Sequence, residues 1–117
     1  MYRVSKEFHF SASHRLDHLA ADHPCARLHG HNYVVVVELA SAELDRNGFV
    51  RDYHDLGALK DYIDGHLDHR HLDDILTVPS TAENLARHLF DWCRARWSET
   101  TAVRVSETPK TWAEYRP

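Results

Sequence analysis

The chain is poor in several residue types that define particular classes of protein. Only two cysteines, Cys25 and Cys93, occur in 117 residues, which excludes a disulfide scaffold and favours a reduced, cytoplasmic protein. Four glycines and four prolines are too few for a flexible linker, so we expect one domain over residues 1–117. The longest apolar run, residues 33–37, is too short to span a membrane, and the residues after Met1 lack the apolar core of a signal peptide.

An excess of basic residues is also missing. The chain has 14 lysines and arginines against 18 acidic residues, which argues against direct binding to nucleic acid. Histidine, in contrast, is frequent, with 11 residues, and at that frequency about one His-x-His pair is expected by chance. The chain has two such pairs, His29/His31 and His69/His71, so their surroundings decide what they mean.

Alternating hydrophobicity predicts strands in both halves of the chain. Residues 2–13 alternate between apolar and polar types, and residues 31–40 carry one tyrosine and four valines. Residues 49–52 follow an Asn-Gly turn and are predicted to be a short strand end. Residues 101–107 and 111–115 are predicted to form the last two strands.

Two helices are predicted between these strands. Leu56, Leu59, Ile63 and Leu67 form one helical stripe, and a polar connection follows over residues 68–78. Ser80-Thr-Ala-Glu83 is a capping box that begins a second helix, with Cys93 on its apolar face. This order predicts an α+β fold with a four-stranded antiparallel sheet, whose two free edges favour an oligomer.

Three histidines predict a metal site. His29 and His31, two residues apart at the start of a strand, point to the same face. His14 ends the first strand on its apolar face, and it meets the other two if the strands pair across the 15–28 loop. Three imidazoles with one open position are typical of catalytic zinc, and solvated or core histidines are the alternative.

Other residue types add possible catalytic groups. Cys25 is a loop thiol beside Arg27, a setting that favours a base or nucleophile, and an inert thiol is the alternative. The adjacent Asp68 and His69 can orient a proton shuttle, although the residues alone favour a solvated loop. Glu107 ends a valine strand, where a carboxylate needs donors from a ligand, a helix cap or a salt bridge.

In combination, these residues resemble the 6-pyruvoyltetrahydropterin synthase family over nearly the whole chain. The resemblance is carried by Phe8-x-Phe-x-Ala-x-His14, Cys25-x-x-x-His29-Gly-His31, Leu67-Asp-His69, Ser80-Thr-Ala-Glu-Asn84 and Ser106-Glu-Thr108. The three-residue spacer between Cys25 and His29 favours the bacterial 6-carboxytetrahydropterin synthase branch of the queuosine pathway. Ser80 and Asp73 depart from the pattern, because many relatives have proline and asparagine there.

The resemblance implies a tunnelling fold, with four antiparallel strands and two helices on one face. Sheets of several subunits would join into a barrel, as in a hexamer, with active sites between subunits. The implied site consists of metal ligands for Zn²⁺ at His14, His29 and His31, a catalytic thiol at Cys25, a proton relay of Asp68 and His69, and substrate contacts at Glu107 and Thr81. Arg27 is a candidate for the cationic patch that a triphosphate requires.

The implied activity is a cytoplasmic lyase reaction on a small pterin triphosphate. In this reaction 7,8-dihydroneopterin triphosphate becomes 6-carboxy-5,6,7,8-tetrahydropterin, with release of acetaldehyde and triphosphate. The product would serve tRNA modification, and the protein itself would not contact nucleic acid. Two alternatives stay open: formation of the 6-pyruvoyl product, and a non-catalytic, histidine-rich metal-binding protein. A cupin-type hydrolase is disfavoured, because the first glutamate after His31 is Glu38, too far along the chain for that motif.

Overall fold

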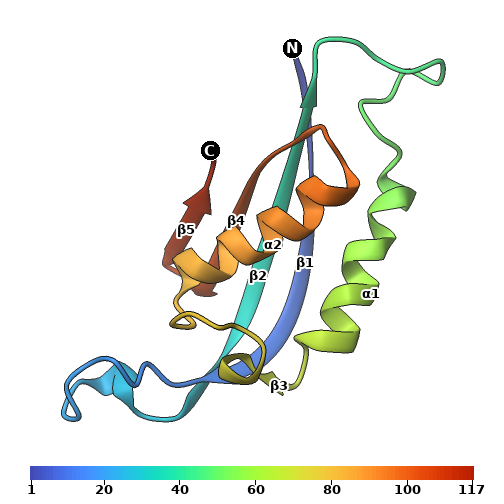
Figure 1. Ribbon diagram of the computed structural model, residues 1–117. Helices are drawn as coiled ribbons and strands as arrows, with labels where there is room; N and C mark the ends of the chain where they lie inside the picture. The colour runs from blue at the N-terminus through green and yellow to red at the C-terminus, as the bar shows by residue number, and fades with distance from the viewer.

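A five-stranded sheet carries two helices on one face in a computed structural model covering residues 1–117 (Figure 1). The strands are β1 (Tyr2–His14), β2 (His29–Ser41), β3 (Arg70–His71), β4 (Thr100–Thr108) and β5 (Thr111–Tyr115). The helices are α1 (Gly57–His66) and α2 (Ala82–Arg96), and short 3₁₀ segments lie at Pro24–Ala26, Tyr53–Leu56 and Leu72–Asp74. The predicted α+β class with two helices is confirmed.

The two longest strands, β1 and β2, form an antiparallel hairpin. Its register runs from Tyr2 opposite Ser41 to His14 opposite His29 without a shift. β4 pairs with β2, and β5 with β4, also in antiparallel orientation. The predicted pairing of the first two strands across a long loop is therefore confirmed, and both strands extend slightly beyond their predicted ends.

The prediction of four antiparallel strands is wrong. The sheet order is β3-β1-β2-β4-β5, and β3 runs parallel to β1 at the edge of the sheet. The His69 N–H donates to the Ser11 carbonyl (2.6 Å) where β3 joins that edge. β3 has only two residues, too few to show a period of two, so residues 68–78 indicated only a connection.

The residues after the first hairpin form no strand, contrary to the prediction for residues 49–52. The Asp45 carboxylate accepts hydrogen bonds from the N–H groups of Asn47 and Phe49 (2.8 and 3.0 Å), which closes the predicted turn with Gly48 at positive φ. The chain then bends into a 3₁₀ segment. Residues 49–52 pair with none of the five strands, so their hydrophobic pattern does not become a strand.

The second helix begins one residue later than predicted. Thr81, not Ser80, is the N-cap of α2, and its hydroxyl accepts a hydrogen bond from the Asn84 N–H (3.2 Å). Ser80 is buried and donates its own hydroxyl to Asp73 (2.5 Å). Serine and threonine are both good N-caps, so tertiary contacts decided between them.

The core lies between one face of the sheet and the two helices, as a cluster of 23 buried residues. α1 contributes Leu59 and Ile63, and α2 contributes Leu85 and Leu89, all on the predicted apolar stripes. Cys93 is fully buried on α2, as expected for a core thiol, and burial raises its pKa to about 12. The apolar face of the hairpin therefore leads from this core to the polar residues at the ends of β1 and β2.

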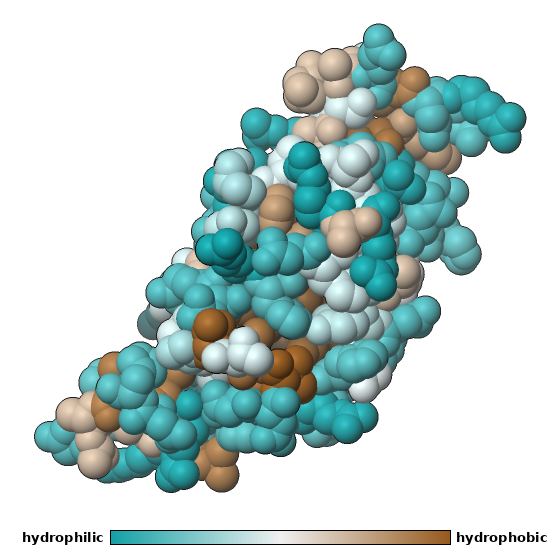
Figure 2. Space-filling model, viewed as in Figure 1, coloured by the Kyte–Doolittle hydropathy of each residue, from teal (hydrophilic) through white to brown (hydrophobic).

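The outer surface of the helical side is mostly hydrophilic. Figure 2 shows hydrophobic residues gathered there only in small areas between broad hydrophilic regions. Neither helix has the length and apolar character that crossing a membrane would require. Both helices are therefore amphipathic elements that cover the sheet with one face.

One ion pair ties the C-terminal end of the chain to the central strand β2. Glu38 accepts hydrogen bonds from Nη1 and Nη2 of Arg116 (2.5 and 3.2 Å) and from the Thr101 hydroxyl (2.6 Å). These contacts, those from Arg116 above all, lower the pKa of Glu38 from its ordinary 4.5 to about 2. The folded state then binds fewer protons than the unfolded state, so the stabilisation is complete above pH 4.5 and is lost as the pH falls through about 2.

We expect Glu38→Gln to lower the thermal midpoint by a few degrees at neutral pH, a small effect because Arg116 is partly exposed to solvent. The difference from wild type should shrink as the pH falls from 4.5 toward 2. Thermal unfolding followed by circular dichroism over this range checks the prediction. A difference that stays constant with pH would show that the charge of Glu38 does not cause the effect.

Candidate metal centre and active site

The hairpin register brings the three predicted metal-binding histidines together. His14 is the last residue of β1 and lies opposite His29, the first residue of β2, while His31 shares the face of His29. One ring nitrogen from each of the three lies within 4.8 Å of the others. Gly30 allows this close approach of the strands, because a Cβ there would lie 3.3 Å from the Ala12 carbonyl oxygen.

Hydrogen bonds define which nitrogen carries the proton in two of these rings. His14 Nδ1 lies 2.7 Å from the Ser80 carbonyl oxygen, and His29 Nδ1 lies 2.6 Å from the Arg27 carbonyl oxygen. A carbonyl oxygen only accepts, so both Nδ1 atoms carry hydrogen. In the neutral rings the two Nε2 atoms are then both acceptors, yet they face each other at 2.8 Å. Two lone pairs at this distance repel, so the pair requires a shared cation, either a proton or a metal ion.

His31 contributes a third imidazole to the same point. Its Nε2 is buried and has no hydrogen-bond partner. Burial lowers the pKa of His31 below its ordinary 6.5, and the nearby Glu107 carboxylate partly opposes this. The neutral ring that burial favours is also the form that binds a metal. Three converging Nε2 atoms, two of them fixed through carbonyls on the opposite ring nitrogen, therefore fit a zinc-type ion.

Two further polar groups beside the histidines lack partners. Glu107 Oε2 lies 3.9 Å from His31 Nε2 and 4.0 Å from His14 Nε2, and it is buried without a hydrogen bond. The Tyr33 hydroxyl is also buried and unpartnered, with its ring stacked on Phe10, and burial raises the pKa of Tyr33 well above its ordinary value. Tyr33 was not among the predicted site residues, although its spacing of two residues from His31 places it on the same face. Such orphaned atoms indicate that a polar ligand completes the site.

Cys25 and Arg27 lie in the long connection between β1 and β2. The Cys25 carbonyl accepts a hydrogen bond from the Leu16 N–H (3.0 Å), and the thiol is free and partly buried. No hydrogen bond joins that thiol to the three histidines. Arg27 is exposed, and its backbone carbonyl, not its side chain, contacts His29. The predicted roles of the Cys25 thiol and the Arg27 guanidinium stay predictions.

Asp68 and His69 form a contact at the edge of the sheet. Asp68 Oδ1 accepts a hydrogen bond from the Ser11 N–H (2.9 Å), and Oδ2 lies 3.0 Å from His69 Nδ1. The hydrogen bond from Ser11 has the largest effect on the pKa of Asp68, and the contact with His69 adds to it. Together they lower this pKa below its ordinary 3.8, so the Asp68 carboxylate is charged at neutral pH. The His69 side chain is 82% exposed, and its backbone has a positive φ of 58°. The pair can orient an imidazole, and its catalytic role stays a prediction.

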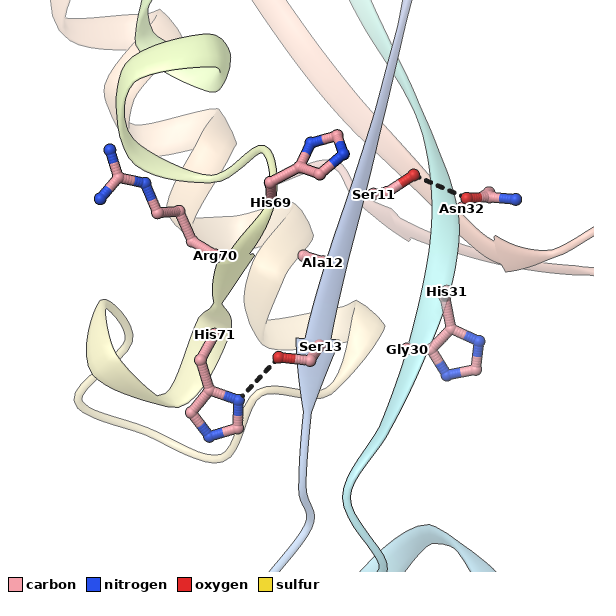
Figure 3. A pocket seen from close by; sticks show the side chains of 9 residues that line it. All are labelled: Ser11, Ala12, Ser13, Gly30, His31, Asn32, His69, Arg70 and His71. Carbon is pink, nitrogen blue, oxygen red and sulfur yellow. Dashed lines mark hydrogen bonds between the residues drawn. The ribbon is translucent and has the colours of Figure 1, made fainter.

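A hollow of about 510 Å³ lies beside His69 (Figure 3). Its lining consists mainly of polar residues from β1, β2, β3 and the turn before β3: Ser11, Ala12, Ser13, Gly30, His31, Asn32, His69, Arg70 and His71. Because strand residues alternate between faces, the Ser11 and Ser13 side chains project from the face opposite to His14. Within one chain, these serines and the histidine cluster therefore lie on different faces of the hairpin.

The groups that hold His14 were also missed from the sequence. The Ser80 carbonyl binds its Nδ1, and Asp73 in turn binds the Ser80 hydroxyl. A backbone carbonyl has no residue signature, and Asp73 is one of several acidic residues in its segment. The one signal was that both residues depart from the family pattern. Thr81, predicted as a substrate contact, uses its hydroxyl to cap α2.

Comparison with known proteins identifies the family of the chain. Residues 3–117 match the sequence model of the family described as 6-pyruvoyl tetrahydropterin synthase. The chain belongs to this family. The 6-carboxy-5,6,7,8-tetrahydropterin synthase of Bacillus subtilis is 32% identical, over 99% of this chain and 86% of its own length. A putative 6-carboxy-5,6,7,8-tetrahydropterin synthase of Archaeoglobus fulgidus is 33% identical, over 92% of this chain and 89% of its own.

The structure of the Caenorhabditis elegans 6-pyruvoyl tetrahydropterin synthase gives the same result for the fold. It superposes with a TM-score of 0.86 and 30% sequence identity, covering 99% of this chain and 95% of that one. The predicted resemblance to the 6-pyruvoyltetrahydropterin synthase family is confirmed, and the chain is an enzyme of the tetrahydropterin synthase family.

Proposed function

We propose that this enzyme converts 7,8-dihydroneopterin triphosphate and one water molecule into 6-carboxy-5,6,7,8-tetrahydropterin, acetaldehyde and triphosphate. The observation that carries the proposal is the cluster of three histidines, in which two acceptor nitrogens face each other at 2.8 Å and require a cation. The names of the Bacillus and Archaeoglobus relatives favour the 6-carboxy product. This product belongs to queuosine biosynthesis, so the protein would act in the cytoplasm and serve tRNA modification without binding RNA.

His14, His29 and His31 would hold a zinc ion through their Nε2 atoms. When bound, zinc supplies a Lewis acid for the hydroxyl groups of the substrate side chain. The carbonyls of Ser80 and Arg27 keep two imidazoles in the tautomer that leaves Nε2 free. The chain itself therefore orients the ligand atoms before any substrate arrives.

Glu107 would anchor the pterin ring. A buried carboxylate oxygen without a partner is costly, and the ring N–H and amino groups of a pterin provide the paired donors that it lacks. Glu107 also lines a hollow of about 280 Å³ together with Trp112 and with Ala82 at the start of α2. Thr81, the N-cap of that helix, adjoins Ala82, which supports its assignment beside the substrate.

Proton transfer would involve Cys25 and the pair of Asp68 and His69. The Cys25 thiolate would take a proton from the substrate side chain, and His69, oriented by Asp68, would exchange protons at the other end. His69 is exposed, and no hydrogen bond joins it to the metal ligands of its own chain. We therefore infer that a neighbouring subunit of a barrel-forming homo-oligomer, a hexamer, supplies this pair. Arg27, exposed beside the site, is the candidate for binding the triphosphate.

The alternative is the 6-pyruvoyl reaction, in which triphosphate is eliminated and the side chain stays whole. The similarity to the Caenorhabditis 6-pyruvoyl tetrahydropterin synthase favours it. Both reactions use the same metal ligands and the same pterin anchor, so only the product separates them.

Product analysis tests the proposal directly. We expect zinc-loaded protein to convert 7,8-dihydroneopterin triphosphate into a 6-carboxy pterin, identified by mass, with one acetaldehyde per turnover. Metal-free protein is the control, and it should form no product. A 6-pyruvoyl compound would establish the alternative, and the absence of any product from a metal-loaded oligomer would overturn the proposed function.

A further inference from the structure

The Asp73 carboxylate uses both of its oxygens in contacts around His14. Oδ1 accepts a hydrogen bond from the Ser80 hydroxyl (2.5 Å), and Oδ2 accepts one from the backbone N–H of Arg15 (2.9 Å). His71 Nε2 lies 3.1 Å from the same Oδ2. One carboxylate thus joins the end of β1, the edge strand β3 and the segment that precedes α2.

The first two partners of Asp73 each adjoin His14. Arg15 follows His14 in the chain, so its bonded N–H fixes the backbone that carries the ring. The Ser80 carbonyl accepts the hydrogen bond from His14 Nδ1 (2.7 Å), and the Ser80 hydroxyl lies 3.4 Å from that nitrogen. His14 and Ser80 are each 1% exposed, so bulk water does not reach these groups to replace lost bonds.

His71 extends the network to the other neighbour of His14. Its Nδ1 lies 3.0 Å from the hydroxyl of Ser13, the residue before His14 (Figure 3). Asp73 is therefore linked to the residues on both sides of the ligand and to the acceptor that sets its tautomer. Outer contacts of this kind orient metal-binding imidazoles, and their removal typically weakens metal binding by about 10- to 100-fold.

We propose that Asp73 is a positioning residue for the metal centre: through Ser80 and Arg15 it holds His14 with Nε2 directed at His29 and His31. This inference rests on the proposed zinc site. Asp73 has no contact with the ring nitrogens that would bind the metal. Its effect should therefore appear in the affinity for the metal and in the ligand geometry, apart from any effect on turnover.

Metal binding by two neighbouring variants provides the test. Asp73→Ala should weaken Zn²⁺ binding by about 10- to 100-fold, measured by competition with a chromophoric chelator. Asp74→Ala is the matched control. It removes the same charge at the next position in the chain, where the Asp74 side chain is exposed and makes no hydrogen bond. In Co²⁺-loaded protein, the visible absorption bands report the ligand geometry. We expect these bands to change in Asp73→Ala and to match wild type in Asp74→Ala.

Two more variants separate positioning from a general loss of structure. Ser80→Ala keeps the carbonyl that binds His14 and removes only the hydroxyl bonded to Asp73, so we expect a smaller loss of Zn²⁺ affinity. In a His14→Ala background, Asp73→Ala should cause no further loss, because Asp73 acts through His14. Thermal unfolding of the metal-free proteins identifies a variant that fails to fold. If Asp73→Ala fails to fold, the Zn²⁺ affinity of Ser80→Ala tests the positioning role instead.

The positioning role of Asp73 and the zinc site itself are overturned by different outcomes. Equal affinities and equal Co²⁺ spectra for Asp73→Ala and Asp74→Ala would overturn the positioning role and leave the zinc site intact. A further loss of affinity in the His14→Ala background would also overturn it. If His29→Ala binds Zn²⁺ as tightly as wild type, the zinc site itself is wrong, and the proposed function fails with it.

Discussion

A Cys25→Ala variant is expected to bind zinc normally and to lose about 100- to 10,000-fold in turnover, the range typical of a lost general base. Cys25 lies in the connection that leads directly into the metal-binding residues, where its thiol is partly buried and engaged with no other side chain. Alanine removes the proton acceptor. The three imidazoles and the carbonyls of Ser80 and Arg27 that orient them stay in place.

The second thiol of the chain provides the control. Cys93 is buried in the core on α2, and burial raises its pKa to about 12, so it stays protonated and unreactive. Cys93→Ala should keep the turnover of wild type, with some loss of stability from the small cavity. Turnover and zinc content are measured on the same preparations, and labelling with iodoacetamide should modify Cys25 only. Full activity of Cys25→Ala would exclude the thiol as the base.

A His29→Ala variant is expected to lose both zinc and turnover. His29 provides one of the two Nε2 atoms that face each other at 2.8 Å, and two imidazoles cannot form the three-ligand site. We expect the zinc affinity to fall by more than about 100-fold, beyond the effect of losing an outer contact. Without His29, the metal-free protein no longer has two facing acceptor nitrogens that must take up a shared proton, so the metal-free variant should be no less stable than the metal-free wild type.

Thermal shift with added zinc measures this effect. A ligand that binds only the folded state stabilises it by about 4 kcal/mol at a concentration 1,000 times its Kd, so the wild-type midpoint should rise strongly. The midpoint of His29→Ala should not respond to the same zinc concentrations. His54→Ala is the control, because His54 is an exposed histidine whose ring has no hydrogen bond. A zinc-dependent rise in His29→Ala equal to that of wild type would exclude His29 as a ligand.

Much of the hairpin that carries the candidate site was predictable from local sequence. Alternation of side chains along a strand depends only on the backbone, so the period of two in β1 and β2 was sufficient to place His29 and His31 on one face. The pairing of the two strands across the long loop then predicted the contact with His14, and the observed register has His14 opposite His29.

Other features depend on contacts between distant segments. β3 exists because the chain after α1 meets the free edge of β1, and its two residues carry no pattern of their own. Ser80 and Thr81 have similar propensities as N-caps, and Asp73 and His14 determine which of them begins the helix. The position of Glu107 beside His31 required the register of β4 on β2.

Sequence alone was sufficient to predict the α+β class, the family resemblance and the residue types of the site, because periodicity and motifs are local properties. The groups that orient the histidines, and the buried polar atoms that lack partners, depend on how distant segments pack together. The Ser80 and Arg27 carbonyls, the Asp73 network and the Tyr33 hydroxyl acquire their roles from burial and from neighbours far away in the chain. Burial removes water as a competing partner, and this makes the position of each remaining donor and acceptor decisive for the chemistry.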